Sequence, residues 1–147
     1  MPSDLSMRLM NGVHRGLIAL TRGRWGWQFG QTPALELTTT GRRTGEPRTT
    51  MLTSPLQLGD ALVVVASRGG DDRHPAWYLN LVANPDVRVS VAGRPPVPMR
   101  ARVLSDGERA ELWPRITATH ANYAAYQRKT TRQIPLVVLE PAVNPPG

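Results

Sequence analysis

The feature that most constrains the fold is the stretch LTTTGRRTGEPRTT, residues 37–50. Apolar and β-branched residues run directly into a tight turn and resume after it, which predicts two strands joined by a hairpin. Gly41 and Gly45 can adopt positive φ angles, and Pro47 marks the start of the second strand. Within seven positions the turn carries three guanidiniums, those of Arg42, Arg43 and Arg48. Such a cluster is either a site for a phosphate or carboxylate or a solvated basic hairpin.

Charge and missing motifs narrow the function classes. The net charge of +7, from 18 basic and 11 acidic residues, indicates an anionic partner. Neither a Walker A sequence nor G-x-G-x-x-G occurs, so the usual nucleotide cradles are absent. There is no cysteine, and the three histidines form no spaced pair of ligands, so we expect no disulfide and no metal site. The sequence shows no secretory signal and no apolar run of 18 residues, which predicts a cytoplasmic protein.

The apolar pattern predicts one domain with short strands and inserted helices. Strands are expected at residues 34–40, 48–57, 61–67, 87–91, 97–104 and 135–140. The run Leu62–Val65 is apolar throughout, as in a central strand buried on both faces. Helices are expected after Pro75, after the capping box of Ser105 and Glu108, and at residues 120–129, with Pro114 kinking or dividing the second. This is an α+β arrangement of about six strands, a small barrel with peripheral helices.

Residues 3–22 predict an amphipathic helix with a basic side. Leucine or valine recurs every three or four positions from Leu5 to Leu20, and arginine recurs every seven from Arg8 to Arg22. Two interpretations remain open, namely a helix packed on the domain and a helix lying on an anionic membrane. We therefore divide the chain into an N-terminal helix and connector (1–32), a barrel domain (33–141) and a tail (142–147).

A second turn of small residues, Ser67–Gly70, follows the predicted central strand. This turn offers several hydrogen-bond donors, namely the Ser67 hydroxyl, the glycine amides and the Arg68 guanidinium. They could donate to a ligand ring or to a phosphate. The alternative is ordinary turn chemistry. On the following helix Trp77 and Tyr78 share a face with Leu81 and Val82, where aromatic side chains usually pack on a core.

A chain of motifs resembles the deazaflavin-dependent nitroreductase family, the split β-barrel oxidoreductases that use coenzyme F420. The motifs are LTTTGRRTGEPRTT, ASRGG, HPAWYLNLVANPDV, ERAELWP, YAAYQRKT and IPLVVLEP, in this order over residues 33–141. The resemblance implies a split barrel of the flavin-reductase and pyridoxamine-oxidase type, with mostly antiparallel strands. It also implies that F420 binds with its phosphate and acidic tail in a basic groove.

The same resemblance implies roles for individual residues. The phosphate and glutamyl carboxylates would meet the turn residues Arg42, Arg43, Thr44, Gly45 and Arg48, together with Arg68. The deazaflavin ring would lie by Ser67, Gly69 and Gly70, with Trp77 as a wall. The acceptor would lie by Tyr123, Tyr126, Ser67 and His120. His120 stands where relatives studied for nitro reduction typically have a third tyrosine, and Arg43 where lysine is common.

These observations predict an F420H2-dependent reductase that delivers hydride to an electron-poor hydrophobic acceptor such as a quinone, an enone or a nitro compound. The deazaflavin carries the hydride chemistry, so the protein must bind, orient and exclude water. One alternative is a non-catalytic F420 carrier or storage protein. Another is an RNA-binding barrel, but no strand carries an aromatic stacking motif and we expect no nucleic acid partner. The expected state is a monomer or homodimer, with peripheral contact at the inner face of the cell membrane through residues 1–22 as an open alternative.

Overall fold

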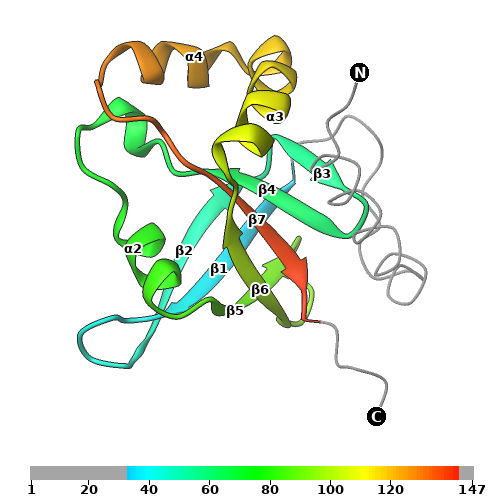
Figure 1. The fold of residues 1–147 in the computed structure, drawn as a ribbon. Coiled ribbons are helices and arrows are strands. Elements are labelled where there is room, and N and C mark those ends of the chain that lie inside the picture. The colour runs from blue at the N-terminus through cyan, green and yellow to red at the C-terminus, as the bar shows by residue number, and fades with distance from the viewer. Residues whose placement is uncertain (1–32, 143–147) are drawn as a thin grey trace.

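The computed structural model describes residues 33–142, which form one antiparallel sheet with helices at its end and side (Figure 1). The sheet order is β2-β1-β5-β6-β7-β4-β3. The strands are β1 (Ala34–Thr40), β2 (Pro47–Thr53), β3 (Leu56–Leu58), β4 (Ala61–Val65), β5 (Asp86–Val91), β6 (Val97–Val103) and β7 (Leu136–Pro141). The helices are the 3-10 turn η1 (Arg68–Gly70), α2 (Ala76–Ala83), α3 (Asp106–Thr119) and α4 (Ala121–Arg128).

The sheet curls until its two edges approach each other. Strands β2 and β3 stand at opposite ends of the sheet order, yet Ser54 and Pro55 alone separate them in the sequence. The Ser54 hydroxyl lies 2.8 Å from the carbonyl oxygens of both Leu56 and Val63, and these hydrogen bonds fix the short connection from β2 to β3. Strands β1 and β2 pair in full register from Ala34 with Thr53 to Thr40 with Pro47. The fold is therefore the predicted split barrel, open between β2 and the β3–β4 hairpin.

Residues 33–142 form seven strands where about six were expected, because the predicted strand at residues 48–57 is divided. Pro55 has no backbone N–H to donate to a ladder, and the chain leaves β2 after Thr53 and starts β3 at Leu56. Strand β4 was predicted to be central. It is fully buried, but it is sixth of the seven strands, next to the edge strand β3.

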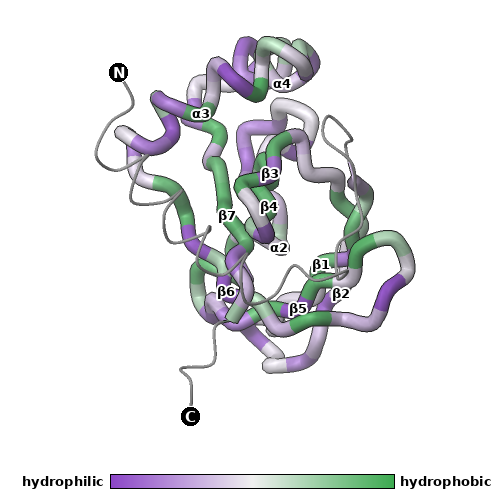
Figure 2. Tube along the Cα trace, turned by 90° about the vertical axis from the view of Figure 1, so that its right-hand side faces the viewer, coloured by the Kyte–Doolittle hydropathy of each residue, from purple (hydrophilic) through white to green (hydrophobic). Residues whose placement is uncertain are grey.

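Burial on both faces of β4 and β7 arises because the two strands separate two cores. Leu62 and Val64 of β4 belong to the core inside the curled sheet, whereas Ala61, Val63 and Val65 face a second core beneath α3. Helix α2 covers the first core with Leu81. Figure 2 shows the resulting apolar stretches of β4 and β7. A continuous valine run is thus what this position in the sheet requires.

The helices begin largely where the sequence predicted. Ser105 and Glu108 form the expected capping box at the start of α3, and Pro75 is the N-cap of α2 rather than its first residue. Val82, predicted on the packed face of α2, is 56% exposed. Helix α3 continues through Pro114 as one element. The carbonyl that the missing N–H would bond belongs to Ala110, which is exposed and so can be solvated.

Candidate functional site

The basic turn between β1 and β2 is closed by its own backbone. Gly41 N donates to Glu46 O at 2.7 Å, and Gly45 N donates to Gly41 O at 2.8 Å. A Cβ atom on Gly41 would lie 3.0 Å from Thr44 Oγ1 and 3.1 Å from the Glu46 oxygen, so a larger residue would require these neighbours to shift. Gly45 adopts a φ of +75°, as its residue type predicted. The turn therefore holds its arginines at fixed backbone positions.

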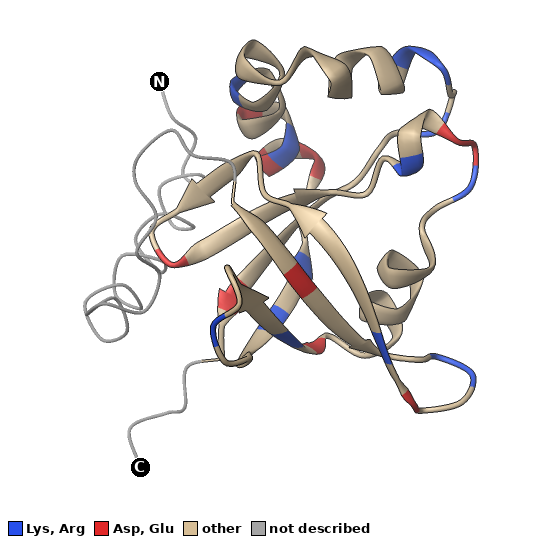
Figure 3. Cartoon of the chain, turned by 180° about the vertical axis from the view of Figure 1, so that it is seen from behind, with Lys and Arg blue, Asp and Glu red and all other residues tan. Residues whose placement is uncertain are grey.

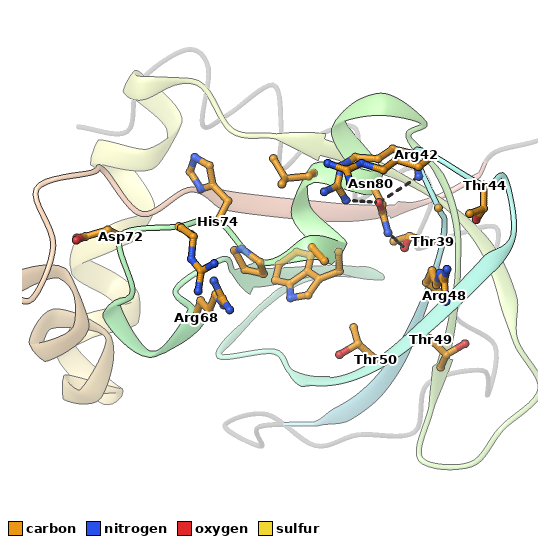
Figure 4. Close-up of a pocket in the computed structure, with 17 residues that line it drawn as sticks. Thr39, Arg42, Thr44, Arg48, Thr49, Thr50, Arg68, Asp72, His74 and Asn80 are labelled. Atoms are coloured by element: carbon orange, nitrogen blue, oxygen red, sulfur yellow. Dashed lines mark hydrogen bonds between the residues drawn. The ribbon is translucent and has the colours of Figure 1, made fainter.

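Arg42 is tied to helix α2 by Asn80. The Asn80 Oδ1 atom accepts from Arg42 N at 3.2 Å and from Arg42 Nη1 at 2.9 Å, as Figure 4 shows. The same side chain donates from Nδ2 to Thr39 Oγ1 at 3.2 Å. Asn80 and Thr39 are both buried. A buried amide thus joins the turn, strand β1 and helix α2.

A groove of about 920 Å³ runs from this turn along α2 to the segment before it. Basic residues lie toward both ends, in the β1–β2 turn and in the segment that precedes α2 (Figure 3). The lining also includes Trp77 and the β2 residues Thr49 and Thr50. The predicted residues that line it are Arg42, Arg43, Thr44, Arg48, Arg68 and Trp77. Guanidiniums, hydroxyls and an indole wall suit a ligand with a flat ring and an anionic tail. We call this cavity the basic groove.

A second cavity of about 550 Å³ lies in the opening of the split barrel. Its lining comes from β2, from the end of β4 and from helix α4. The predicted residues that line it are Ser67, Arg68, Gly69, Trp77, Tyr123 and Tyr126. The two tyrosine rings meet edge to face with centroids 6.0 Å apart. We call this cavity the tyrosine pocket.

The basic groove and the tyrosine pocket adjoin each other. Arg68, Pro75 and Trp77 line both. Trp77 also packs on the core inside the sheet, so its side chain is anchored while it walls the two cavities. Ligands in the two cavities would therefore lie next to each other.

Three predicted site residues line neither cavity. Gly45 stands at the turn, and Gly70 packs under α4, where an added Cβ would lie 2.7 Å from Tyr126 O. His120 joins α3 to α4, with Nδ1 2.8 Å from Thr119 Oγ1 and its ring centroid 6.2 Å from that of Tyr123. Gly70 thus allows α4 to approach the Ser67 turn, and His120 lies behind Tyr123.

Sequence reasoning missed three residues that shape the site. Asn80 is one. His74 lines the basic groove, and its ring lies 4.7 Å from that of Tyr78. Burial and the neighbouring Arg132 guanidinium lower the pKa of His74, while burial raises the pKa of Tyr78. The Arg132 guanidinium donates hydrogen bonds to the carbonyl oxygens of Ala66 and Ser67, at the start of the turn Ser67–Gly70, which we call the Ser67 turn. A polar residue on the apolar face of α2 could have signalled Asn80, but nothing local marks the role of the Arg132 guanidinium, whose partners lie more than 50 positions away.

Two further observations concern the described part of the chain. Residues 33–142 contain no helix long and apolar enough to cross a bilayer. Over the same range no group of three histidine, cysteine or acidic side chains is placed to hold a metal ion. The N-terminal helix predicted at residues 3–22 lies outside the described residues.

Comparison with known proteins gives a consistent family assignment. The sequence model of the F420H(2)-dependent quinone reductase family matches residues 13–141. The F420H(2)-dependent quinone reductase Rv1261c of Mycobacterium tuberculosis is 45% identical over 141 residues, which cover 90% of this chain and 88% of that one. Residues 13–141, which the family model matches, include the β1–β2 turn, the turn Ser67–Gly70 and helix α4.

Solved structures share the fold. A structure described as an F420-H2 dependent reductase (FDR-A) superposes with a TM-score of 0.63 at 39% identity, covering 74% of this chain and 94% of that one. A second, described as a domain-swapped dimer, has a TM-score of 0.64 at 32% identity and covers 94% and 100%. A protein of the pyridoxinephosphate oxidase family from Clostridium acetobutylicum has a TM-score of 0.52 at 8% identity, covering 91% and 84%. This last likeness concerns the fold alone, and it agrees with the predicted split-barrel class.

Proposed function

The chain belongs to the F420H(2)-dependent quinone reductase family, and from that premise we propose that the basic groove holds coenzyme F420 and the tyrosine pocket holds the quinone. The observation that carries this proposal is the shared wall of the two cavities at Arg68, Pro75 and Trp77. Hydride transfer requires donor and acceptor in direct contact at a defined orientation. Two adjoining cavities, one basic and one lined by tyrosines, support an arrangement of this kind.

The donor set of the basic groove fits the cofactor. Arg42, Arg43 and Arg48 would bind the phosphate and the glutamyl carboxylates, since guanidiniums form paired hydrogen bonds with such groups. Thr44 lies beside them in the lining. The deazaflavin ring would lie at the end of the basic groove beside Trp77, where it would extend to Ser67 and Gly69 at the border of the tyrosine pocket. When bound, reduced F420 supplies the hydride, and the protein supplies binding and orientation.

The tyrosine pocket would hold the acceptor and stabilise the charge that forms on it. Tyr123 and Tyr126 lie one helical turn apart on α4 and both line the pocket. Their hydroxyls can donate to a quinone oxygen, and such a donor contributes most when negative charge develops there. The apolar walls given by Val64, Val65 and Leu52 suit a hydrophobic ring. His120 lines neither cavity, so we assign it no contact with the acceptor.

The test is a pair of measurements on the purified protein. Titration with F420, followed by cofactor fluorescence, should show saturable binding, and oxidation of F420H2 by menadione should follow. Tyr126→Phe should lower kcat/KM for menadione while leaving F420 affinity unchanged. Tyr78→Phe is the matched control, because Tyr78 packs on the core and lines neither cavity.

The outcomes separate the alternatives. Tight F420 binding with no turnover of menadione, cyclohexenone or a nitroimidazole would favour the carrier protein instead. A Tyr126→Phe variant that loses F420 affinity along with activity on every acceptor would place Tyr126 at the cofactor, and the assignment of the tyrosine pocket would be wrong.

Membrane contact, location and assembly remain predictions for this chain. We expect a cytoplasmic protein that is a monomer or a homodimer, and the domain-swapped dimer among its structural relatives supports the dimer. If this segment docks on a membrane, deleting residues 1–22 should reduce co-sedimentation with anionic liposomes and leave F420 binding intact. Unfolding of the deletion variant would instead assign the segment to the core of the fold.

A further inference from the structure

The Arg132 guanidinium holds both ends of the turn that separates β4 from α2. Its Nη1 donates to Ala66 O at 3.2 Å and its Nη2 to Ser67 O at 2.8 Å. Its Nε donates to Asp71 O at 2.8 Å. One planar side chain thus bridges the residues before and after η1. Arg132 belongs to the connection between α4 and β7 and lines neither cavity.

The turn that Arg132 closes has an unusual backbone. Three consecutive residues adopt positive φ angles, namely Arg68 at 45°, Gly69 at 62° and Gly70 at 87°. Arginine in this region is strained, and such a conformation persists where surrounding contacts determine it. The three hydrogen bonds from Arg132 are contacts of this kind. A second tie links the same segments, since Thr130 Oγ1 donates to Asp72 Oδ1 at 2.7 Å.

Arg132 also determines the proton position on His74. Its Nη1 lies 3.2 Å from His74 Nδ1. A guanidinium has donors and no acceptor, so Nδ1 must be the unprotonated nitrogen. This contact fits a neutral His74 ring that carries its proton on Nε2. Burial and the Arg132 charge act in the same direction, because both lower the pKa of His74.

We propose that Arg132 is the positioning residue of this reductase site: it fixes the Ser67 turn against the tyrosine pocket and holds His74 as the Nε2–H tautomer in the basic groove. The inference rests on the proposed function for its catalytic consequence, but not for the geometry itself. Ser67 and Gly69 line the tyrosine pocket, and His74 lines the basic groove. Arg132 contacts residues of both cavities but lines neither cavity itself.

The geometry predicts a split between binding and turnover. Arg42 of the β1–β2 turn is anchored by Asn80 rather than by Arg132. Most of the F420 affinity should therefore survive a change at Arg132. The deazaflavin ring and the acceptor, in contrast, would no longer be bordered by a Ser67 turn in a fixed position. A small misplacement of reacting groups can lower a rate by about a hundredfold.

The first experiment needs no turnover. Nitrogen-15 NMR of the wild-type protein, with histidine labelled and His74 assigned by His74→Gln, should show a protonated Nε2 and an unprotonated Nδ1 at pH 7.5. A charged His74 ring, or a proton on Nδ1, would overturn the proposal. In Arg132→Lys and Arg132→Gln the tautomer signal should change.

The second experiment compares Arg132→Gln and Arg132→Lys with the matched control Arg109→Gln. Arg109 anchors the same connection, donating from Nε to Ile134 O at 2.8 Å and from Nη2 to Gln127 Oε1 at 3.1 Å, but it does not contact the Ser67 turn. Arg132→Gln should lower kcat for menadione about tenfold or more while the F420 dissociation constant changes less than about threefold. Lysine lacks the planar fork, so Arg132→Lys should recover less than half of the lost kcat. Arg109→Gln should keep kcat near that of the wild type even where thermal stability falls.

Two results would overturn the assignment. One is an Arg132→Gln variant whose kcat falls no further than that of Arg109→Gln at equal loss of thermal stability. The other is full activity in Arg132→Lys, which would mean that a positive charge at this position, without the planar guanidinium, is enough to position the Ser67 turn. A wild-type protein that binds no F420 would refute the proposed function, whereas the NMR result on His74 would still decide the geometric part.

Discussion

Asn80 offers a test in which protein stability and cofactor affinity should respond to different substitutions. The Asn80 amide accepts two hydrogen bonds from Arg42 and donates one to Thr39. Asn80 is 4% exposed and Thr39 is 2% exposed. Asn80→Ala removes all three bonds, and at about 1 kcal/mol for each it should cost about 3 kcal/mol of unfolding free energy. For a domain of this size the melting temperature should fall by about 6 to 12 °C.

Asn80→Asp should have the opposite profile. The carboxylate can accept both bonds from Arg42, and the Thr39 hydroxyl can rotate to donate to it, so the melting temperature should change little. The new charge neutralises Arg42, however. If Arg42 meets an anionic group of F420, losing that contact should cost about 1.5 to 3 kcal/mol, which weakens F420 binding about tenfold to hundredfold. In Asn80→Ala the Arg42 charge remains, so affinity should fall much less.

The assays are thermal unfolding by circular dichroism and titration of F420 by fluorescence at two salt concentrations. Asn84→Asp is the control, since it adds the same charge one helical turn further along, outside the lining of the basic groove. An equal loss of affinity in Asn84→Asp would indicate a general effect of net charge. Unchanged affinity in Asn80→Asp would refute the contact between Arg42 and the cofactor, and an unchanged melting temperature in Asn80→Ala would refute the stabilising role of the tie.

Three further substitutions test the basic groove, the packing of α4 against Gly70 and the ion pair at the start of α3. Arg48→Ala should weaken F420 binding about tenfold to hundredfold and make that binding less sensitive to salt, as fluorescence titration at low and high ionic strength would show. Gly70→Ala, whose new Cβ would lie 2.7 Å from Tyr126 O at a φ of 87°, should destabilise the protein by about 1 to 3 kcal/mol and lower menadione turnover more than F420 affinity. Burial alone would raise the pKa of Glu108, but its hydrogen bonds with Arg102 and the Ser105 amide outweigh this and lower it. The stability that Glu108 contributes is therefore present above its ordinary pKa of 4.5 and is lost as the pH falls through the pKa of the folded state. In thermal melts from pH 7 to pH 3, the melting temperature of Glu108→Gln should depend less on pH than that of the wild type. The same pH dependence in both proteins would show that the Arg102–Glu108 ion pair does not contribute to stability.

Local patterns in the sequence determined much of this protein. The hairpin around the basic turn, the capping box at Ser105 and the doubly buried strand β4 all depend on neighbouring residues and on burial preference, which a sequence displays directly. The order of motifs identified the F420-dependent reductases, as the family match confirms. The spacing of glycine and arginine singled out the basic turn and the Ser67 turn, and the family resemblance made them candidate cofactor contacts, an assignment that stays a prediction.

Tertiary structure decided what depends on contacts between distant segments. The order of strands, with the edges brought together at Ser54 and Pro55, placed β2 opposite β4 and so created the tyrosine pocket. His120 was expected there from its helical spacing with Tyr123, but the break between α3 and α4 leaves it outside the lining. Arg132 escaped notice because its partners lie 58 to 66 positions earlier in the chain. Side-chain periodicity indicates which residues share a face, whereas the pairing of faces depends on how the sheet closes, and no short stretch of sequence contains that information.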